Sequence, residues 1–237
     1  AAAGRIPPPQ RADPVRPGHR WHRGRVTDLL AGPRVPGFDV TPLDRDLAAP
    51  RGTRPSGALT AFKLARRQFL EGKRIDMGAL AAQVGVNRVT LYRWVGRRED
   101  LLLRVLWALT EQNLATQYAV AARNGETGRG RIPAIMARYV RDILSHHGFR
   151  TFLAEEGELA MRLGTVPERG LHPRLVRYVE LLLREDVELG VRDECVPPQD
   201  LAFAAVRIVE SFVYSTRITG EDPDPDRPIR ILNVLLR

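Results

Sequence analysis

Apolar residues recur every three or four positions from residue 56 onward, which is the spacing of one face of an α-helix. Glycine and proline residues separate these periodic segments. We see no sustained alternation of apolar and polar residues, so we predict an all-α chain of about nine or ten helices. The expected helices lie at about 56–72, 77–84, 88–95, 98–122, 131–146, 149–163, 173–189, 199–218 and 227–236.

The first 55 residues differ in composition from the rest of the chain. They hold 10 of the 18 prolines, many arginines and glycines, and only short apolar clusters. Such a segment cannot bury enough apolar surface to offset the entropy lost on ordering. We therefore expect residues 1–55 to form an extended, poorly ordered arm. Two interpretations stay open: a basic arm that touches DNA, and a disordered tail.

The segment 76–96 has the pattern of two short helices that cross at a steep angle. Asp76 and Asn87 are suited to cap the two helices, and Gly85 is suited to a turn with a positive φ angle. The apolar residues of the second helix fill the space beneath the turn. This leaves its first residues and outer face free for the major groove of DNA: Arg88, Val89, Thr90, Tyr92 and Arg93.

Charge is distributed unevenly along the chain. Residues 1–100 hold 19 Lys and Arg against 9 Asp and Glu, whereas the remainder is close to neutral, so the net charge of +9 belongs to the N-terminal part. Concentrated positive charge attracts polyanions, and nucleic acid is the first such partner to consider. The preference for Arg over Lys is typical of a GC-rich genome, but such a bias alone leaves the neutral second part unexplained.

The region 56–105 resembles the DNA-binding domain of the tetracycline-repressor (TetR) family. The positions that carry the resemblance are Leu80 and Ala81, Val84 to Asn87, Thr90, Leu91 and Tyr92, Trp94 and Val95, and Arg98 to Leu102. Segments 58–67 and 91–95 are similar to the branch of this family named for the quorum-signal degradation regulator, QsdR. In the rest of the chain only the number and order of helices correspond.

This resemblance implies a three-part organisation and a dimer. Residues 56–105 would form a helix-turn-helix DNA-binding domain, and residues 106–237 a helical domain for effector binding and dimerisation. Two late helices would pair with their copies in a second chain, and the other possibility is that their apolar faces belong to the core of one chain. The implied dimer residues are Leu175, Val179, Leu182, Leu201, Ala205, Ile208 and Phe212.

The resemblance also implies roles in DNA binding. Tyr92 and Arg98 would grip backbone phosphates, and Arg88, Thr90 and Arg93 would read bases, with Val89 in apolar contact and Asn87 at the helix start. Arg97 stands where the family often has a capping residue, so the long helix is expected to be less well capped. Val95 replaces a usual Phe and is expected to loosen the packing.

Apolar side chains in the second domain are candidates for an effector pocket, although such residues also fit an ordinary core. The candidates are Trp107, Met136, Tyr139, Phe152, Met161 and Phe203. We expect no metal and no cofactor, because neighbours in the acidic pair at 155–156 and the histidine pair at 146–147 point to different sides of a helix.

The sequence therefore predicts a cytoplasmic DNA-binding regulator with no membrane association, most simply a repressor released from a pseudo-palindromic operator by a small lipophilic effector. We find no catalytic motif, no run of 18 apolar residues and no secretion signal, and the one cysteine, Cys195, cannot form an internal disulfide. A transcriptional activator would bind DNA with the same helix, so activation stays open beside repression. The alternative is a small-molecule sensor or adaptor that does not bind an operator.

Overall fold

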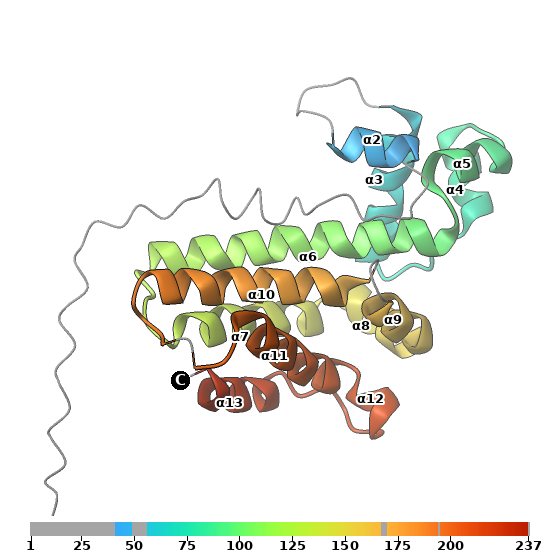
Figure 1. Ribbon diagram of the computed structural model, residues 1–237. Helices are drawn as coiled ribbons and strands as arrows, with labels where there is room; N and C mark the ends of the chain where they lie inside the picture. The colour runs from blue at the N-terminus through green and yellow to red at the C-terminus, as the bar shows by residue number, and fades with distance from the viewer. Residues whose placement is uncertain (1–40, 49–55, 167–169, 194, 237) are drawn as a thin grey trace, which may run out of the picture.

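The computed structural model describes residues 41–48, 56–166, 170–193 and 195–236, and the regular secondary structure of these residues is entirely helical (Figure 1). This confirms the predicted all-α class. The helices are α2 (Pro42–Ala48), α3 (Gly57–Leu70), α4 (Met77–Val84), α5 (Arg88–Val95), α6 (Arg98–Arg123), α7 (Arg131–Ser145), α8 (His147–Glu155), α9 (Gly157–Thr165), α10 (Leu171–Glu188), α11 (Pro198–Val213), α12 (Ser215–Ile218) and α13 (Asp226–Leu235).

The long helix α6 joins two groups of helices (Figure 1). Helices α2 to α5 gather at its N-terminal end, and α7 and α10 lie along the remainder, with α11 and α13 packed beyond them. We call α7 to α13, with the C-terminal part of α6, the body. Helices α8 and α9 lie at the end of the body that faces α3, and α8 packs directly on α3.

Two helices that the sequence predicts as continuous are interrupted. The helix expected over 149–163 breaks at Glu156, where φ is −127° and ψ is 36°, and the one expected over 199–218 breaks at Tyr214. After the first break, a Cβ atom at Gly157 would overlap the Arg217 guanidinium. The apolar spacing continues across both breaks, so periodicity alone does not reveal them.

Helix α2 corrects the prediction of an extended arm for part of the first 55 residues. Leu43 is fully buried, and α2 packs against α3 and α5. The Asp44 carboxylate accepts two hydrogen bonds from the Arg104 guanidinium, at 2.6 and 2.7 Å, and one from the Thr41 backbone N–H at 3.0 Å. The rest of the predicted arm, 1–40 and 49–55, lies outside the described residues.

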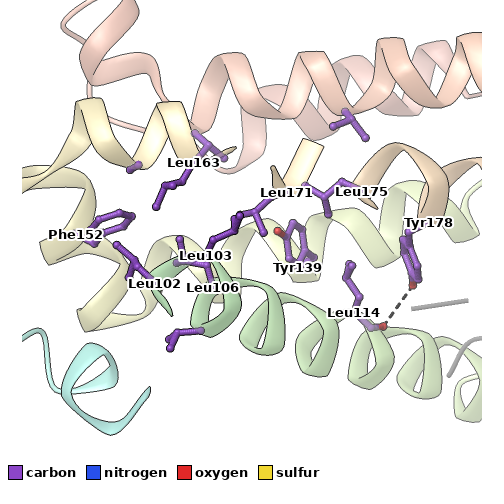
Figure 2. Close-up of a cluster of buried hydrophobic side chains, with 14 of the residues drawn as sticks. Leu102, Leu103, Leu106, Leu114, Tyr139, Phe152, Leu163, Leu171, Leu175 and Tyr178 are labelled. Carbon is purple, nitrogen blue, oxygen red and sulfur yellow. Dashed lines mark hydrogen bonds between the residues drawn. The ribbon is translucent and has the colours of Figure 1, made fainter. Parts of the chain in front are cut away.

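A continuous apolar core fills the space between α6, α7, α8 and α10 (Figure 2). Leu102 and Phe152 lie at one end of the cluster, and the Tyr178 hydroxyl donates to the Leu114 carbonyl, at 3.4 Å, at the other. Beside it, Arg131 of α7 donates to Asp186 of α10 at 2.6 Å. Buried charges need such a partner, so this pair fixes the position of α7 against α10.

Candidate nucleic-acid interface

The turn between α4 and α5 has the conformation that the sequence predicts. Gly85 adopts φ 79° and ψ 32°, in the left-handed region that other residues enter at a cost. The backbone N–H of Gly85 donates to the Ala82 carbonyl at 3.1 Å, and that of Val86 donates to the Ala81 carbonyl at 3.0 Å. These two bonds end α4 and turn the chain sharply toward α5.

Polar side chains cap both helices of this motif. The Asp76 carboxylate accepts from the Ala79 N–H at 2.7 Å, and the Asn87 amide oxygen accepts from the Thr90 N–H at 2.8 Å. Both bonds satisfy backbone donors that would have no partner within the helix. Asn87 thus has a structural role at the start of α5, while its predicted contact with DNA stays a prediction.

The inner face of α5 is anchored in the core. Leu91 and Val95 are completely buried, and the looser packing expected at Val95 stays a prediction. Trp94 packs on the first turn of α3, where a Cβ atom at Gly57 would overlap the indole ring. Fixing one side of α5 in this way fixes the direction of its opposite side.

The outer face of α5 presents a cation beside apolar and aromatic surface. Val89 is 69% exposed, Tyr92 is 43% exposed, and Arg93 is also exposed. Arg88 is exposed but leans back over α4, where its guanidinium lies against Gly78. An exposed Val and Tyr on a fixed helix have no role in the core, and together with Arg93 they match the chemistry of a base edge and a phosphate.

Arg98 does not join this face. Its Nε donates to the Ile75 carbonyl at 2.8 Å, and a terminal nitrogen donates to the Glu156 carboxylate at 2.6 Å. Its side chain is only 21% exposed. The predicted phosphate contact of Arg98 is therefore not available in this conformation, because the guanidinium holds two other segments of the chain.

Two acidic residues of this region have roles that the sequence analysis did not predict. Glu156 binds Arg98 from 58 residues away, and no local pattern could have indicated that pairing. Asp100 accepts from the Arg97 backbone N–H at 2.9 Å and so supplies a reciprocal cap for α6. The start of α6 is consequently better capped than Arg97 alone suggests, and the signal was an acidic residue three positions after the cap.

The chain is similar to known proteins in both sequence and structure. Residues 127–237 match the family model described as the C-terminal domain of tetracyclin repressor-like proteins. The structure is similar to that of the transcriptional repressor QsdR, from the TetR family, of R. erythropolis, with a TM-score of 0.65 and 26% identity over 76% of this chain and 94% of the other. No curated protein sequence matches the chain.

Residues 127–237 form a domain of the tetracyclin repressor-like C-terminal family, and the chain is similar in structure to a TetR-family repressor. The similarity to QsdR agrees with the resemblance of segments 58–67 and 91–95. Members of this family regulate transcription and are not enzymes. None of the helices in the described ranges is long and apolar enough to cross a membrane, and the same ranges contain no cluster of three metal-binding side chains.

The dimer residues expected for a TetR regulator divide into two sets. Leu175, Val179, Leu182 and Ala205 are buried inside the protomer, so for these four the prediction of an interface was wrong. They pack α10 and α11 against their own chain. The other three, which are Leu201, Ile208 and Phe212, are half-buried toward the outer side of α11.

The predicted effector-pocket residues do not all meet. Met136, Tyr139 and Phe152 are buried in the core of the body, and Met161 is half-buried beside it. Trp107 is half-buried under the Arg174 guanidinium, which lies 4.6 Å from its ring centre. Phe203 is 53% exposed on the outer side of α11, which excludes it from an internal pocket in this conformation.

Proposed function

We propose that this chain is a sequence-specific DNA-binding repressor that acts as a dimer and is released by a small lipophilic effector. The observation that carries the proposal is the outer face of α5, where Val89, Tyr92 and Arg93 are exposed on a helix whose other side is fixed by Leu91 and Val95. Presenting such side chains on a rigid element is what direct readout of base edges requires.

The contacts with DNA follow from the chemistry of this face. Arg93 is suited to donate two hydrogen bonds to a guanine, Val89 to contact a thymine methyl group, and Tyr92 to donate to a phosphate oxygen. Thr90 and Arg88 lie at the margin of the face, and the N-terminus of α5 offers backbone donors to a phosphate. The cytoplasm is the compartment in which this DNA is accessible.

The dimer is proposed to form through the outer side of α11. Ala204 and Ser211 are small, and Ile208 between them is apolar and half-buried, so a second copy of the helix can approach closely. A twofold arrangement places two α5 helices in successive major grooves of a pseudo-palindromic operator.

The effector site is proposed in the apolar cluster of the body, between α6, α7 and α10 (Figure 2). The cluster supplies apolar surface, and Tyr139 within it supplies a hydroxyl. Burial raises the pKa of Tyr139 to about 12, although a hydrogen bond with Thr110 acts in the opposite direction, so the hydroxyl stays protonated and able to donate. A lipophilic ligand with one hydrogen-bond acceptor fits this chemistry.

The test is binding to DNA from the gene's own upstream region, measured by fluorescence anisotropy over a salt series. Arg93→Ala and Tyr92→Ala should each weaken specific binding about tenfold, because each removes a contact with a base or a phosphate. The matched control is Arg123→Ala, which removes the same charge from an exposed site at the far end of α6 and should leave affinity near the wild-type value. Wild-type binding no tighter than to random DNA would instead favour the sensor or adaptor alternative.

A further inference from the structure

The contact between the helices proposed to bind DNA, α3 to α5, and the body includes one guanidinium that joins several segments, that of Arg98. Arg98 is the first residue of α6 and follows the end of α5 by only three positions. Its guanidinium donates one hydrogen bond to the carbonyl of Ile75, in the loop before α4, and another to the carboxylate of Glu156, in the break between α8 and α9. Three segments that are distant in sequence therefore meet at Arg98.

Glu156 is the body's part of this junction. One carboxylate oxygen accepts from Arg98 at 2.6 Å, and the other lies 3.7 Å from Nε of Arg74, in the same loop before α4. The Glu156 side chain is 17% exposed, so solvent screens the pair with Arg98 only in part. Arg74 lies in the loop between α3 and α4 and Arg98 directly follows α5 at the start of α6, so this single carboxylate ties the helices α3, α4 and α5 to the body from two sides.

Close packing surrounds the ionic contact. A Cβ atom at Gly148 in α8 would overlap the Phe69 carbonyl oxygen at the end of α3, so the two backbones touch there. The rings of Phe69 and Phe152 meet edge to face, with centroids 5.7 Å apart. Phe152 also borders the apolar cluster beside Leu102 (Figure 2). The backbone N–H of Glu156 donates to the carbonyl of Phe152 at 2.9 Å, which links the cluster to the ionic junction.

From these contacts we infer that Glu156 is a positioning residue, which acts through Arg98 to fix the orientation of the DNA-binding helices on the body. A displacement of Phe152 is passed to Glu156 by the backbone bond between them, and from there to the start of α6 and to α5. Orientation on the body is a property of one chain, and only its consequence for operator binding rests on the proposed function. The inference rests on a set of packed contacts, and a substitution at Glu156 can measure how strongly these contacts are coupled.

The test is the distribution of distances between α4 and α10 within one chain, measured by pulsed electron paramagnetic resonance. Cys195 is replaced by serine, spin labels are attached to cysteines introduced at the exposed Ala82 of α4 and Arg177 of α10, and an excess of unlabelled protein isolates distances within a chain. The wild-type background should give one narrow distribution, and Glu156→Gln a distribution about twofold broader. The matched control is Glu155→Gln, which removes a neighbouring exposed carboxylate and should stay narrow.

Glu156→Asp keeps a carboxylate for Arg98 and Arg74 and should broaden the distribution less than Glu156→Gln does, and an unchanged circular dichroism spectrum of Glu156→Gln would exclude a loss of folding. An unchanged width in Glu156→Gln would overturn the inference. If operator binding exists, Glu156→Gln should also weaken it about tenfold, because a loosely held motif loses more freedom on binding. A broader distribution in a protein whose wild type binds no operator would overturn the proposed function and leave the positioning role of Glu156 established.

Discussion

Glycine is required at Gly148 and at Gly85 for different physical reasons. At Gly148 the space for a Cβ atom is already occupied by the backbone of Phe69 in α3, so the residue permits two helices to touch. At Gly85 nothing lies within 4 Å of an added Cβ atom, and the requirement is the positive φ angle of the turn. The first is a constraint on tertiary structure and the second a local one.

Alanine at these two sites should therefore have unequal effects. We expect Gly148→Ala to lower the free energy of unfolding by about 3 kcal/mol, because the backbones of α3 and α8 must separate. Gly85→Ala should cost only about 1 kcal/mol, the strain of a left-handed residue with a side chain. Urea unfolding followed by circular dichroism measures both. Equal losses would mean that α8 does not press on α3 in solution.

Local signals in the sequence predicted the caps and the turn of the helix-turn-helix motif, but they did not predict the pairs between residues far apart in the chain. The caps at Asp76 and Asn87 and the turn at Gly85 follow from rules that act over four residues or fewer. The role of Arg98 does not, because its partner Glu156 comes close only once the body has folded. A basic residue at that place in the chain was consequently predicted to face DNA, whereas it faces its own chain.

At the scale of elements, α2 is a helix that the amino-acid composition of its segment did not predict. Its surroundings are rich in proline and arginine, which indicates disorder, yet Thr41 and Asp44 form a cap of the usual kind. The two carboxylate oxygens of Asp44 then bind the guanidinium of Arg104, so α2 is held on α6 as well as on α3 and α5. A helix of seven residues is marginal alone, and its stability depends on this docking.

The docking of α2 should depend on pH. Burial disfavours the ionised form of Asp44, but the hydrogen bonds from Arg104 and Thr41 outweigh it and keep its pKa below the usual value of 3.8. Because the folded pKa is the lower one, the contribution of Asp44 is present above about pH 4 and is lost as pH falls through the folded pKa. Asp44→Asn should cost on the order of 1 kcal/mol at pH 7, reduced by solvent exposure.

The measurement is urea unfolding of wild type and Asp44→Asn between pH 3 and pH 7. Subtracting the two curves removes the acid sensitivity of every other group. The difference should shrink below about pH 4. A difference that stays constant down to pH 3 would show that the charge of Asp44 does not hold α2.

At the scale of the whole molecule, the helical periodicity of α10 and α11 identified apolar faces without identifying what covers them. Leu175 and Val179 have the spacing of an interface, and in the structure their own chain buries them. The outer side of α10 is charged, with Arg184 paired to Glu180 at 2.7 Å. A sequence of one chain cannot separate contacts within a protomer from contacts between protomers, because both bury apolar surface.

The corrected dimer surface can be tested at Ser211, which is exposed on the outer side of α11 and donates through its hydroxyl to the Arg207 carbonyl at 2.8 Å. Thr116 on α6 is a matched site, since it is exposed and donates to the Gln112 carbonyl at the same distance. Arginine is a good helix former, so neither substitution should alter folding. Sedimentation velocity at micromolar concentration should show Ser211→Arg as a monomer and Thr116→Arg as a dimer, because a long cation between two closely packed helices keeps them apart. Should Ser211→Arg remain dimeric, the interface lies on another surface, and the exposed apolar side of α13 would be the next to examine.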